Sequence, residues 1–316
     1  MLKTRINVIM VAAVLLMTGC GVRKNAENVV KKNSSSAEKT AVTADIQADA
    51  AVVSYLGPEG TYTQEACGKF FGGKGGYEPY ETVTDAVAAL AEGKSNYAVI
   101  PQENTIGGAV TDYVDILISQ ADASVVGEVE LPINQNLLTI KGTELSDIKT
   151  VYSHKQGIAQ GKEWLEKNLP DAEVIEVSST AEGAKMVSEK GDKSCAAIAS
   201  AACADVYGLE VSAAAIQNND SNKTRFYVLS MQQPATADAG RTAFIASGKA
   251  ELLSGIMSDI KSMGIKLVAV HDRPLKTQLG EYAYVIECAG CSYSQYSKLA
   301  ENSSMDMRFL GCFDVK

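Results

Sequence analysis

Thr224, Arg225 and Phe226 bring a hydroxyl, a guanidinium and an aromatic ring together just before an apolar run, 227–229. A hydroxyl can donate a proton, and a guanidinium can hold a carboxylate through two parallel hydrogen bonds. The β-prone run predicts a strand, and a strand start holds such side chains still. By itself the segment 222–226 is explained equally well as a polar turn, so other segments must decide its meaning.

A second polar segment, 57–63 (GPEGTYT), joins a predicted strand to a predicted helix. Its glycines permit close approach of the backbone, and Thr61 or Thr63 can cap the helix. The N–H groups at such a helix start can bind an anion. A simple capped turn would have the same sequence.

Three more polar segments stand at the ends of predicted strands or open predicted helices. Glu103 and Asn104 end a strand, where open α/β sheets present ligand-binding groups. The segments 153–160 (SHKQGIAQ) and 179–184 (STAEGA) indicate helix starts, the second with a serine cap and a glutamate in the first turn.

Strand-like and helix-like runs alternate from residue 51 onward. This alternation favours parallel sheets covered by helices, and two successive sets predict two small α/β lobes with a ligand cleft between them. Strands are expected over 51–56, 97–100, 123–129, 134–140, 150–152, 173–177 and 195–199, and helices over 63–71, 83–92, 110–118, 156–167 and 180–189.

The polar segments, together with 196–200 and 207–209, resemble the ordered motifs of prephenate dehydratases. The family patterns are G-P-x-G-T-[FY]-[ST], V-x-P-x-E-N-S-x-x-G-x-V, S-H-P-Q-A-L-x-Q, S-T-x-E-A-A and N-x-T-R-F. Thr105, Lys155 and Gly157 depart from them. The resemblance covers residues 53–232 almost without gaps.

The resemblance implies periplasmic-binding-protein-like type II lobes that convert prephenate to phenylpyruvate with loss of water and CO₂, in phenylalanine biosynthesis and without a cofactor. It implies that Thr224 acts at the departing ring hydroxyl and that Arg225 holds the side-chain carboxylate, with Phe226 beside them. His154 receives only a minor, capping role. The expected substrate-binding residues are Thr61, Thr63, Glu103, Asn104, Thr105, Ser153, Gln156 and Ser179.

Composition and motifs argue against several other functions. The net charge is −9, and no basic stripe follows residue 32, so nucleic-acid binding has little support. The sequence contains no Walker loop, dinucleotide fingerprint or cluster of metal ligands, so we expect neither a metal nor another cofactor.

The N-terminus has the pattern of an export signal. Lys3 and Arg5 precede an apolar run, 6–17, that is too short to span a membrane and right for a signal peptide. It ends in LMTGC, which resembles the lipobox of bacterial lipoproteins, in which cleavage leaves Cys20 as the lipid-carrying first residue. We therefore expect residues 1–19 to be removed and the protein to be anchored by lipid outside the cytoplasmic membrane, or to lie in the periplasm. A plain secretion signal with an incidental cysteine is the alternative.

Residues 20–50 are polar and lack aromatic side chains, which predicts a flexible tether before a catalytic domain over 51–233. Six cysteines follow Cys20, and export would permit some of them to pair. Cys288 and Cys291 have redox or metal spacing, but chance is the better explanation because no second pair or nearby histidine completes a site.

Residues 240–316 follow the β-α-β-β-α-β order of ferredoxin-like domains. Strands are expected over 242–246, 266–271, 282–287 and 308–313, and helices over 250–263 and 292–300. The size and position of this region resemble the ACT regulatory domain of prephenate dehydratases, which makes a homodimer or homotetramer the expected assembly.

Two segments of the family's ACT domain help to bind phenylalanine. Here the first contains Leu253, with Glu251 where the family has glycine, and the second retains Arg273 and Pro274 after Asp272. Because glutamate obstructs close backbone approach, we expect a weak phenylalanine effect or none.

Two alternatives stay open. Arogenate, which differs from prephenate by an amino group, could be the substrate. A two-lobed lipoprotein could also be a solute-binding protein or a sensor, since prephenate is made in the cytoplasm. The retained Thr224 hydroxyl favours the enzyme.

Overall fold

The computed structural model describes residues 41–120 and 122–316. The predicted signal peptide, Cys20 and most of the predicted tether lie outside the described residues. Within the described part of the chain, no helix is both long enough and apolar enough to cross a membrane.

The first lobe is built on a mixed sheet in the order β2-β1-β3-β11-β5. Its strands are β1 (Val52–Leu56), β2 (Gly76–Tyr80), β3 (Tyr97–Asn104), β5 (Ser124–Pro132) and β11 (Lys223–Ser230), with the short β4 (Gly108–Ala109) paired to β3. The expected parallel pairing holds for β1 with β2 and β3, whereas β11 runs antiparallel to both β3 and β5. The sequence missed β2, which contains a glycine and a proline.

Helices cover both faces of this sheet. The helix α1 (Tyr62–Phe71) packs on one face, and α2 (Val83–Ala91) and α3 (Thr111–Ser119) pack on the other. The bounds of α1 follow from local chemistry, because Thr61 accepts a hydrogen bond from Gln64 N at its start and Gly72 ends it at φ 67°.

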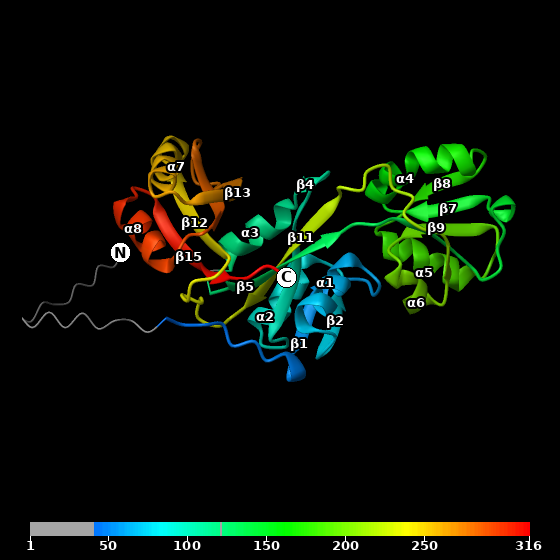
Figure 1. Ribbon diagram of the computed structural model, residues 1–316, viewed down its shortest axis with the longest axis horizontal. Coiled ribbons are helices and arrows are strands. Elements are labelled where there is room, and N and C mark those ends of the chain that lie inside the picture. Colours follow the sequence, from blue (N-terminus) through cyan, green and yellow to red (C-terminus); the bar gives the residue numbers. More distant parts are fainter. Residues whose placement is uncertain (1–40, 121) are drawn as a thin grey trace, which may run out of the picture. The chain divides into compact units, whose positions relative to one another are not determined.

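The second lobe has the strand order β10-β6-β9-β7-β8. Figure 1 shows its sheet between α4 on one side and α5 and α6 on the other. The elements are β6 (Asn136–Thr139), β7 (Thr150–Ser153), α4 (Lys155–Asn168), β8 (Glu173–Glu176), α5 (Thr180–Lys190), β9 (Cys195–Ala199), α6 (Ala202–Tyr207) and β10 (Glu210–Ala213). The expected strands and helices of this lobe are present, and α6 and β10 are additions.

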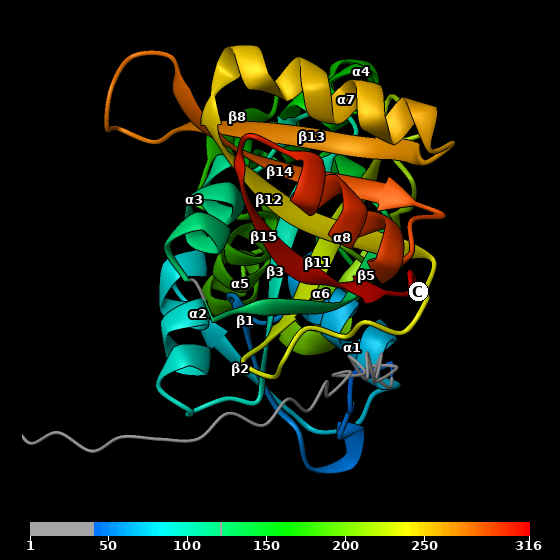
Figure 2. The ribbon, with the colours of Figure 1, turned by 90° about the vertical axis from the view of Figure 1, so that its left-hand side faces the viewer.

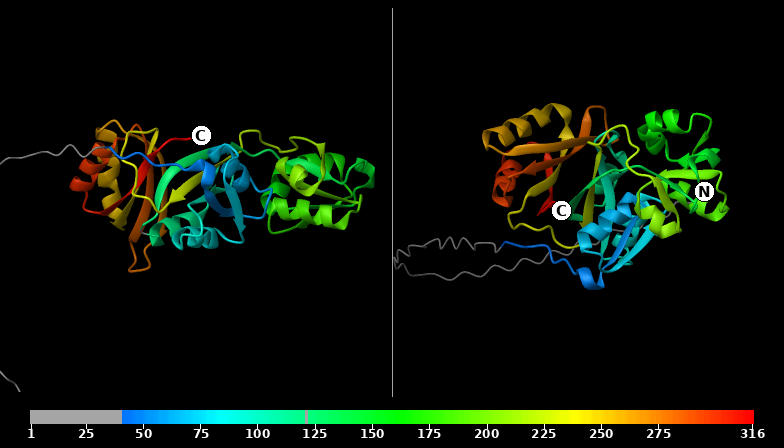
Figure 3. Two further views of the ribbon diagram at one scale, coloured as in Figure 1. Left: turned by 90° about the horizontal axis from the view of Figure 1, so that it is seen from below. Right: turned by 45° about the vertical axis from the view of Figure 1, so that its right-hand side comes forward.

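The chain crosses twice between the lobes, through residues 133–135 and 214–222, and both crossings can be followed in Figure 3. The second crossing leads directly into β11. This is why Thr224, near the start of β11, lies where the lobes meet.

The C-terminal region has the predicted ferredoxin-like order, with sheet order β13-β14-β12-β15 and antiparallel pairing throughout. Figure 2 shows α7 and α8 together on one face of this sheet. The elements are β12 (Arg241–Lys249), α7 (Leu253–Ser262), β13 (Lys266–Pro274), β14 (Glu281–Ala289), α8 (Tyr293–Asn302) and β15 (Asp306–Phe313).

The other face of the C-terminal sheet packs on the first lobe. Ile245 and Val285 share a buried apolar cluster with Tyr113, Leu117 and Tyr227. The domain is therefore joined to the first lobe by a continuous core, which includes the strand that carries Thr224.

Residues 41–50 correct one expectation. Val42 N donates to Thr236 Oγ1 at 2.9 Å, and Gln47 N donates to Tyr97 OH at 3.0 Å. Ala44 and Ile46 pack against the core of the first lobe. The last ten residues of the predicted tether are thus held by the folded chain, because small apolar side chains and backbone groups find partners there.

The six cysteines after Cys20 are all buried, and none forms a disulfide. Burial raises the pKa of the Cys288 thiol to about 12 and that of Cys291 to about 11. These thiols therefore stay protonated near neutral pH and act as small apolar side chains.

Candidate active site

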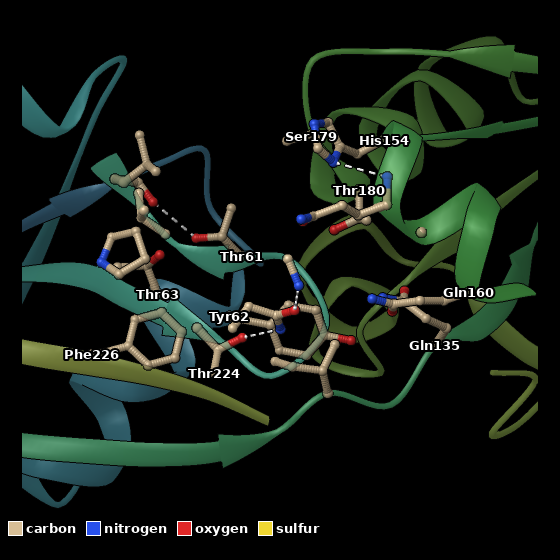
Figure 4. Close-up of a pocket in the computed structure, with 18 of the residues that line it drawn as sticks. Thr61, Tyr62, Thr63, Gln135, His154, Gln160, Ser179, Thr180, Thr224 and Phe226 are labelled. Atoms are coloured by element: carbon tan, nitrogen blue, oxygen red, sulfur yellow. Dashed lines mark hydrogen bonds between the residues drawn. The ribbon is translucent and has the colours of Figure 1, made fainter. Parts of the chain in front are cut away.

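A cavity of about 510 Å³ lies between the two lobes, next to the first crossing and the start of β11. Figure 4 shows Thr224 and Phe226 of the first lobe on one side and His154 and Ser179 of the second lobe on the other. Of the residues predicted for the site, the structure brings together Thr61, Thr63, Asn104, Gln156, Ser179, Thr224 and Phe226.

The Thr224 hydroxyl is oriented by Asn104. Asn104 Nδ2 donates to Thr224 Oγ1 at 2.9 Å and to Asn222 Oδ1 at 2.8 Å. Asn104 Oδ1 accepts from the N–H groups of Ile106 and Gly107, which fixes the orientation of the amide. The Thr224 oxygen accepts this hydrogen bond, and its proton has no acceptor among the described residues, so it can be donated to a ligand.

Three helix starts meet at the cavity. Thr61, His154 and Ser179 are the N-caps of α1, α4 and α5, and all three line it. The first N–H groups of a helix have no partner within the helix, and the helix dipole adds positive potential there. The cavity is therefore suited to an anionic ligand.

His154 acts as the cap that the sequence predicted. Its Nδ1 accepts from Gln156 N at 3.3 Å, so the neutral ring carries its proton on Nε2. Gln156 itself reaches the first lobe, since a Cβ at Gly107 would overlap its side-chain amide. A glycine at 107 thus permits close approach of the two lobes.

Sequence reasoning missed several residues that line the cavity, notably Tyr62, Gln135, Gln160 and Thr180. Gln135 Nε2 donates to Gln160 Oε1 at 2.9 Å, and both side chains are buried. Gln135 lies in a crossing segment and carries no sequence signal of its own, so only the fold could reveal it. Gln160 is the last glutamine of the segment matched to S-H-P-Q-A-L-x-Q, so that motif could have pointed to it.

The second lobe also holds the loop in front of α1. Ser200 Oγ donates to Gly60 O at 3.0 Å, and Tyr207 OH donates to Glu59 O at 2.7 Å. These contacts account for two positions in the motif segments 196–200 and 207–209. They fix the loop that leads to Thr61.

Arg225 is not part of the cavity. Successive residues of a strand point to opposite faces, so Arg225 points away from the side that Thr224 and Phe226 line. Its guanidinium binds Glu103 at 2.8 Å, Glu287 at 3.0 Å and Glu128 at 3.3 Å. The expected role of Arg225 as a receptor for a substrate carboxylate does not fit this position, nor does a substrate contact from Glu103.

Thr105 and Ser153 also lie off the cavity. The Thr105 hydroxyl exchanges hydrogen bonds with the backbone of Lys223. Ser153 is buried and donates to Ile198 O at 2.7 Å. A Cβ at Gly157 would overlap Ser153 Oγ, so glycine at this position makes room for the serine. Both hydroxyls support the backbone around the site.

The positions expected to bind phenylalanine have other partners or none. Arg273 donates to both oxygens of Asp115 on α3, each at 2.6 Å, and this pairing lowers the pKa of that carboxyl. Leu253 packs against the core beneath α7, while Asp272 and Pro274 are exposed.

The charges around the cavity are few. Among the described residues that line it, none is a lysine or arginine, and Asp112 is the one carboxylate. A ligand's carboxylates would therefore be held by neutral donors, namely helix N–H groups, hydroxyls and amides.

Two α/β lobes around a polar cavity, with a ferredoxin-like domain packed on the first, define a two-lobed ligand-cleft protein. Residues 53–234, more than half of the chain, match the family model described as prephenate dehydratase. The chain belongs to the prephenate dehydratase family.

Relatives agree with this assignment. A bifunctional chorismate mutase/prephenate dehydratase from Aquifex aeolicus is 34% identical over 240 residues, 75% of this chain and 65% of that protein. This chain thus spans slightly less than two thirds of the length of such bifunctional relatives.

Solved structures show the same fold. Prephenate dehydratase from Arthrobacter aurescens in complex with L-Phe is 29% identical with a TM-score of 0.74, covering 83% of this chain and 89% of that one. GqqA, described as a quorum-quenching acylase, is 23% identical with a TM-score of 0.75, covering 84% and 98%. At that identity the likeness concerns the fold alone.

Proposed function

We propose that this protein is a prephenate dehydratase that converts prephenate to phenylpyruvate, water and CO₂. The observation that carries this proposal is the Thr224 hydroxyl, which accepts from Asn104 and keeps its own proton free inside a cavity ringed by helix starts. That arrangement serves a substrate with a departing hydroxyl and two carboxylates.

The reaction needs one proton and no oxidant. The ring C–O bond breaks as the departing hydroxyl is protonated, and water leaves. The electrons of the bond between the ring and its carboxylate then complete the aromatic ring, and CO₂ leaves. Thr224 donates to the departing oxygen, and the net proton comes from solvent, because a threonine hydroxyl is too weak an acid to stay ionised.

The cavity offers different surroundings for the two carboxylates. The starts of α4 and α5, with His154, Ser179 and Gln156, supply donors for the side-chain carboxylate. The ring carboxylate fits better near Phe226 and Pro101, since a strong ion pair would oppose its loss as CO₂. Arogenate fits the same donors and remains the alternative substrate.

The flanking regions belong to the same proposal. The ferredoxin-like domain is an ACT-type domain that responds weakly, if at all, to phenylalanine and supports a homodimer or homotetramer. The N-terminus carries a lipoprotein signal that places the enzyme outside the cytoplasmic membrane, anchored through Cys20.

A turnover assay tests the activity directly. Purified protein without residues 1–40 is mixed with prephenate, and phenylpyruvate is followed by its absorbance in alkali. We expect turnover that follows saturation kinetics, with arogenate run in parallel and phenylalanine as its product. Prephenate binding by calorimetry without conversion of either substrate would overturn the proposal and favour a solute-binding or sensor lipoprotein.

A further inference from the structure

Glu287 extends from the C-terminal domain into the first lobe. It lies on β14, and its carboxylate is 1% exposed. Its Oε2 accepts from Tyr227 OH at 2.6 Å and from Gln102 Nε2 at 3.1 Å, and its Oε1 accepts from Arg225 Nη1 at 3.0 Å and Arg241 Nε at 3.1 Å. Each carboxylate oxygen of Glu287 thus accepts two hydrogen bonds, and three of the four donors belong to the first lobe.

Two of these donors are alternate residues of β11. Arg225 and Tyr227 point to the C-terminal domain, while Thr224 and Phe226 point into the cavity. Glu287 therefore holds β11 from the face opposite the cavity, through the two residues on either side of Phe226. We call this set of contacts the clamp.

The clamp also reaches the partner of Thr224. In the ladder between β11 and β3, Thr224 pairs with Asn104 and Arg225 pairs with Glu103. Arg225 Nη2 binds Glu103 Oε2 at 2.8 Å while Nη1 binds Glu287. The Arg225 guanidinium thus connects β14 to β3 and β11, the two strands that carry the hydrogen bond between Asn104 and Thr224.

We propose that Glu287 is a positioning residue of the active site, which sets the Thr224 hydroxyl against Asn104 through Arg225 and Tyr227. This inference rests on the proposed function, because it assigns part of the active-site framework to the C-terminal domain. It predicts that the domain is needed for full turnover whether or not it binds an effector.

The balance of charge explains why a variant should still fold. Arg225 and Arg241 face Glu103, Glu287 and the fully buried Glu128. Burial, and then Glu287, raise the pKa of Glu128 to about 8, so Glu128 is largely protonated at neutral pH and the cluster is nearly neutral. If Glu287 loses its charge, Glu128 can ionise in its place, but Glu128 lies on β5 and cannot tie β11 to β14.

The test compares Glu287→Gln with Glu281→Gln. Glu281 lies at the other end of β14 and binds only Thr277 and Gln278 of its own hairpin, so it controls for loss of a carboxylate from that strand. We expect Glu287→Gln to lower kcat by at least tenfold with KM within about threefold, and Glu281→Gln to change neither. Assays are run well below the unfolding midpoint of each variant.

Two further measurements separate positioning from simple destabilisation. In an Arg225→Met background, Glu287→Gln should lower kcat by a smaller factor than in the wild type, because the link through Arg225 is already lost and only that through Tyr227 remains. The NMR methyl resonance of Thr224 should shift in Glu287→Gln and stay in place in Glu281→Gln.

The outcomes are distinct. An unchanged kcat in Glu287→Gln would overturn the inference. So would a loss of kcat on Glu287→Gln that is as large in the Arg225→Met background as in the wild type. If the wild type does not convert prephenate, the proposed function fails, and the Thr224 resonance then decides the inference alone: a signal unmoved by Glu287→Gln disproves it.

Discussion

Thr224 and Arg225 are neighbours in the chain, yet their side chains act on opposite faces of β11. Thr224 faces the cavity and receives a hydrogen bond from Asn104. Arg225 faces three carboxylates on the other side. The motif therefore combines one residue that faces the cavity with one that holds the strand from the other side.

Thr224→Ala should lower kcat about 10²-fold or more while KM changes much less. The methyl group that remains fills the site but offers no donor to the departing hydroxyl. Initial rates of phenylpyruvate formation measure the effect. Thr224→Ser, which keeps the hydroxyl, is the control and should retain most of the activity; near-normal turnover in Thr224→Ala would show that the assigned role is wrong.

Glu128 should make the stability of the protein depend on pH. It faces Arg225 and Tyr227 on β11, Arg241 on β12 and Glu287 on β14, and burial raises its pKa from 4.5 to about 8. A carboxyl with a raised pKa in the folded state adds stability below the unfolded pKa, and this is lost as pH rises through the folded pKa.

Urea unfolding of the wild type and Glu128→Gln at pH 5, 7 and 9 measures this dependence. The wild type should lose stability relative to the variant from pH 5 to pH 9, because glutamine mimics the protonated form at every pH. A constant difference across this range would show that Glu128 titrates normally.

At the scale of elements, the starts of the helices contribute more to the site than the sides of the helices do. The starts of α1, α4 and α5 surround the cavity, and their caps are a threonine, a histidine and a serine. Each cap begins its helix and also lines the site. The positive potential that a lysine or arginine would supply comes instead from three groups of backbone N–H.

Ser179→Ala should destabilise the fold by about 1 kcal/mol and also raise KM several-fold. The Ser179 hydroxyl accepts from Glu182 N at 3.0 Å, and without it the first turn of α5 frays at the cavity. Ser292→Ala is a matched control, because Ser292 caps α8 in the same way, through Gln295 N, in the C-terminal domain. Equal values of KM for both variants would contradict a role of the α5 start in binding.

For the whole molecule, the C-terminal domain is joined to the first lobe by an apolar core and by the clamp of Glu287. Arg273, expected to help bind an effector, instead holds Asp115 on α3. The domain thus supports the lobe that carries Thr224 with a residue, Arg273, that the sequence suggested for ligand binding.

Phenylalanine should bind weakly or not at all. Glu251 is exposed at the segment where close backbone approach is required, and Arg273 already has a carboxylate partner. Isothermal calorimetry with the protein lacking residues 1–40 should give no heat at micromolar phenylalanine. A micromolar dissociation constant would contradict this expectation; tryptophan serves as the ligand control.

Cys20 should carry lipid in cells. The motivation is the lipobox-like LMTGC at the end of an apolar run of signal-peptide length. Radiolabelled palmitate should enter the wild type and be absent from Cys20→Ala, with Cys67→Ala as the cysteine control. Equal label in the wild type and Cys20→Ala would leave a plain secretion signal as the better interpretation.

The sequence alone determined the features that depend on neighbours in the chain. Helix caps, apolar runs and the order of strands and helices are local, so most elements, the two lobes and the ferredoxin-like order followed from residue patterns. Thr61, Asn104, Ser179 and Thr224 were found because they stand at element ends in segments that resemble the family motifs, and all four line the cavity.

The tertiary structure alone decided which groups face each other. Gln135 and Gln160 come together only because the chain crosses between lobes. Arg225 could not be assigned from its motif, since its partner Glu287 is 62 residues away on a strand of another domain. A guanidinium binds whichever carboxylate the packing brings near, and that choice depends on burial and distance, which no local pattern records.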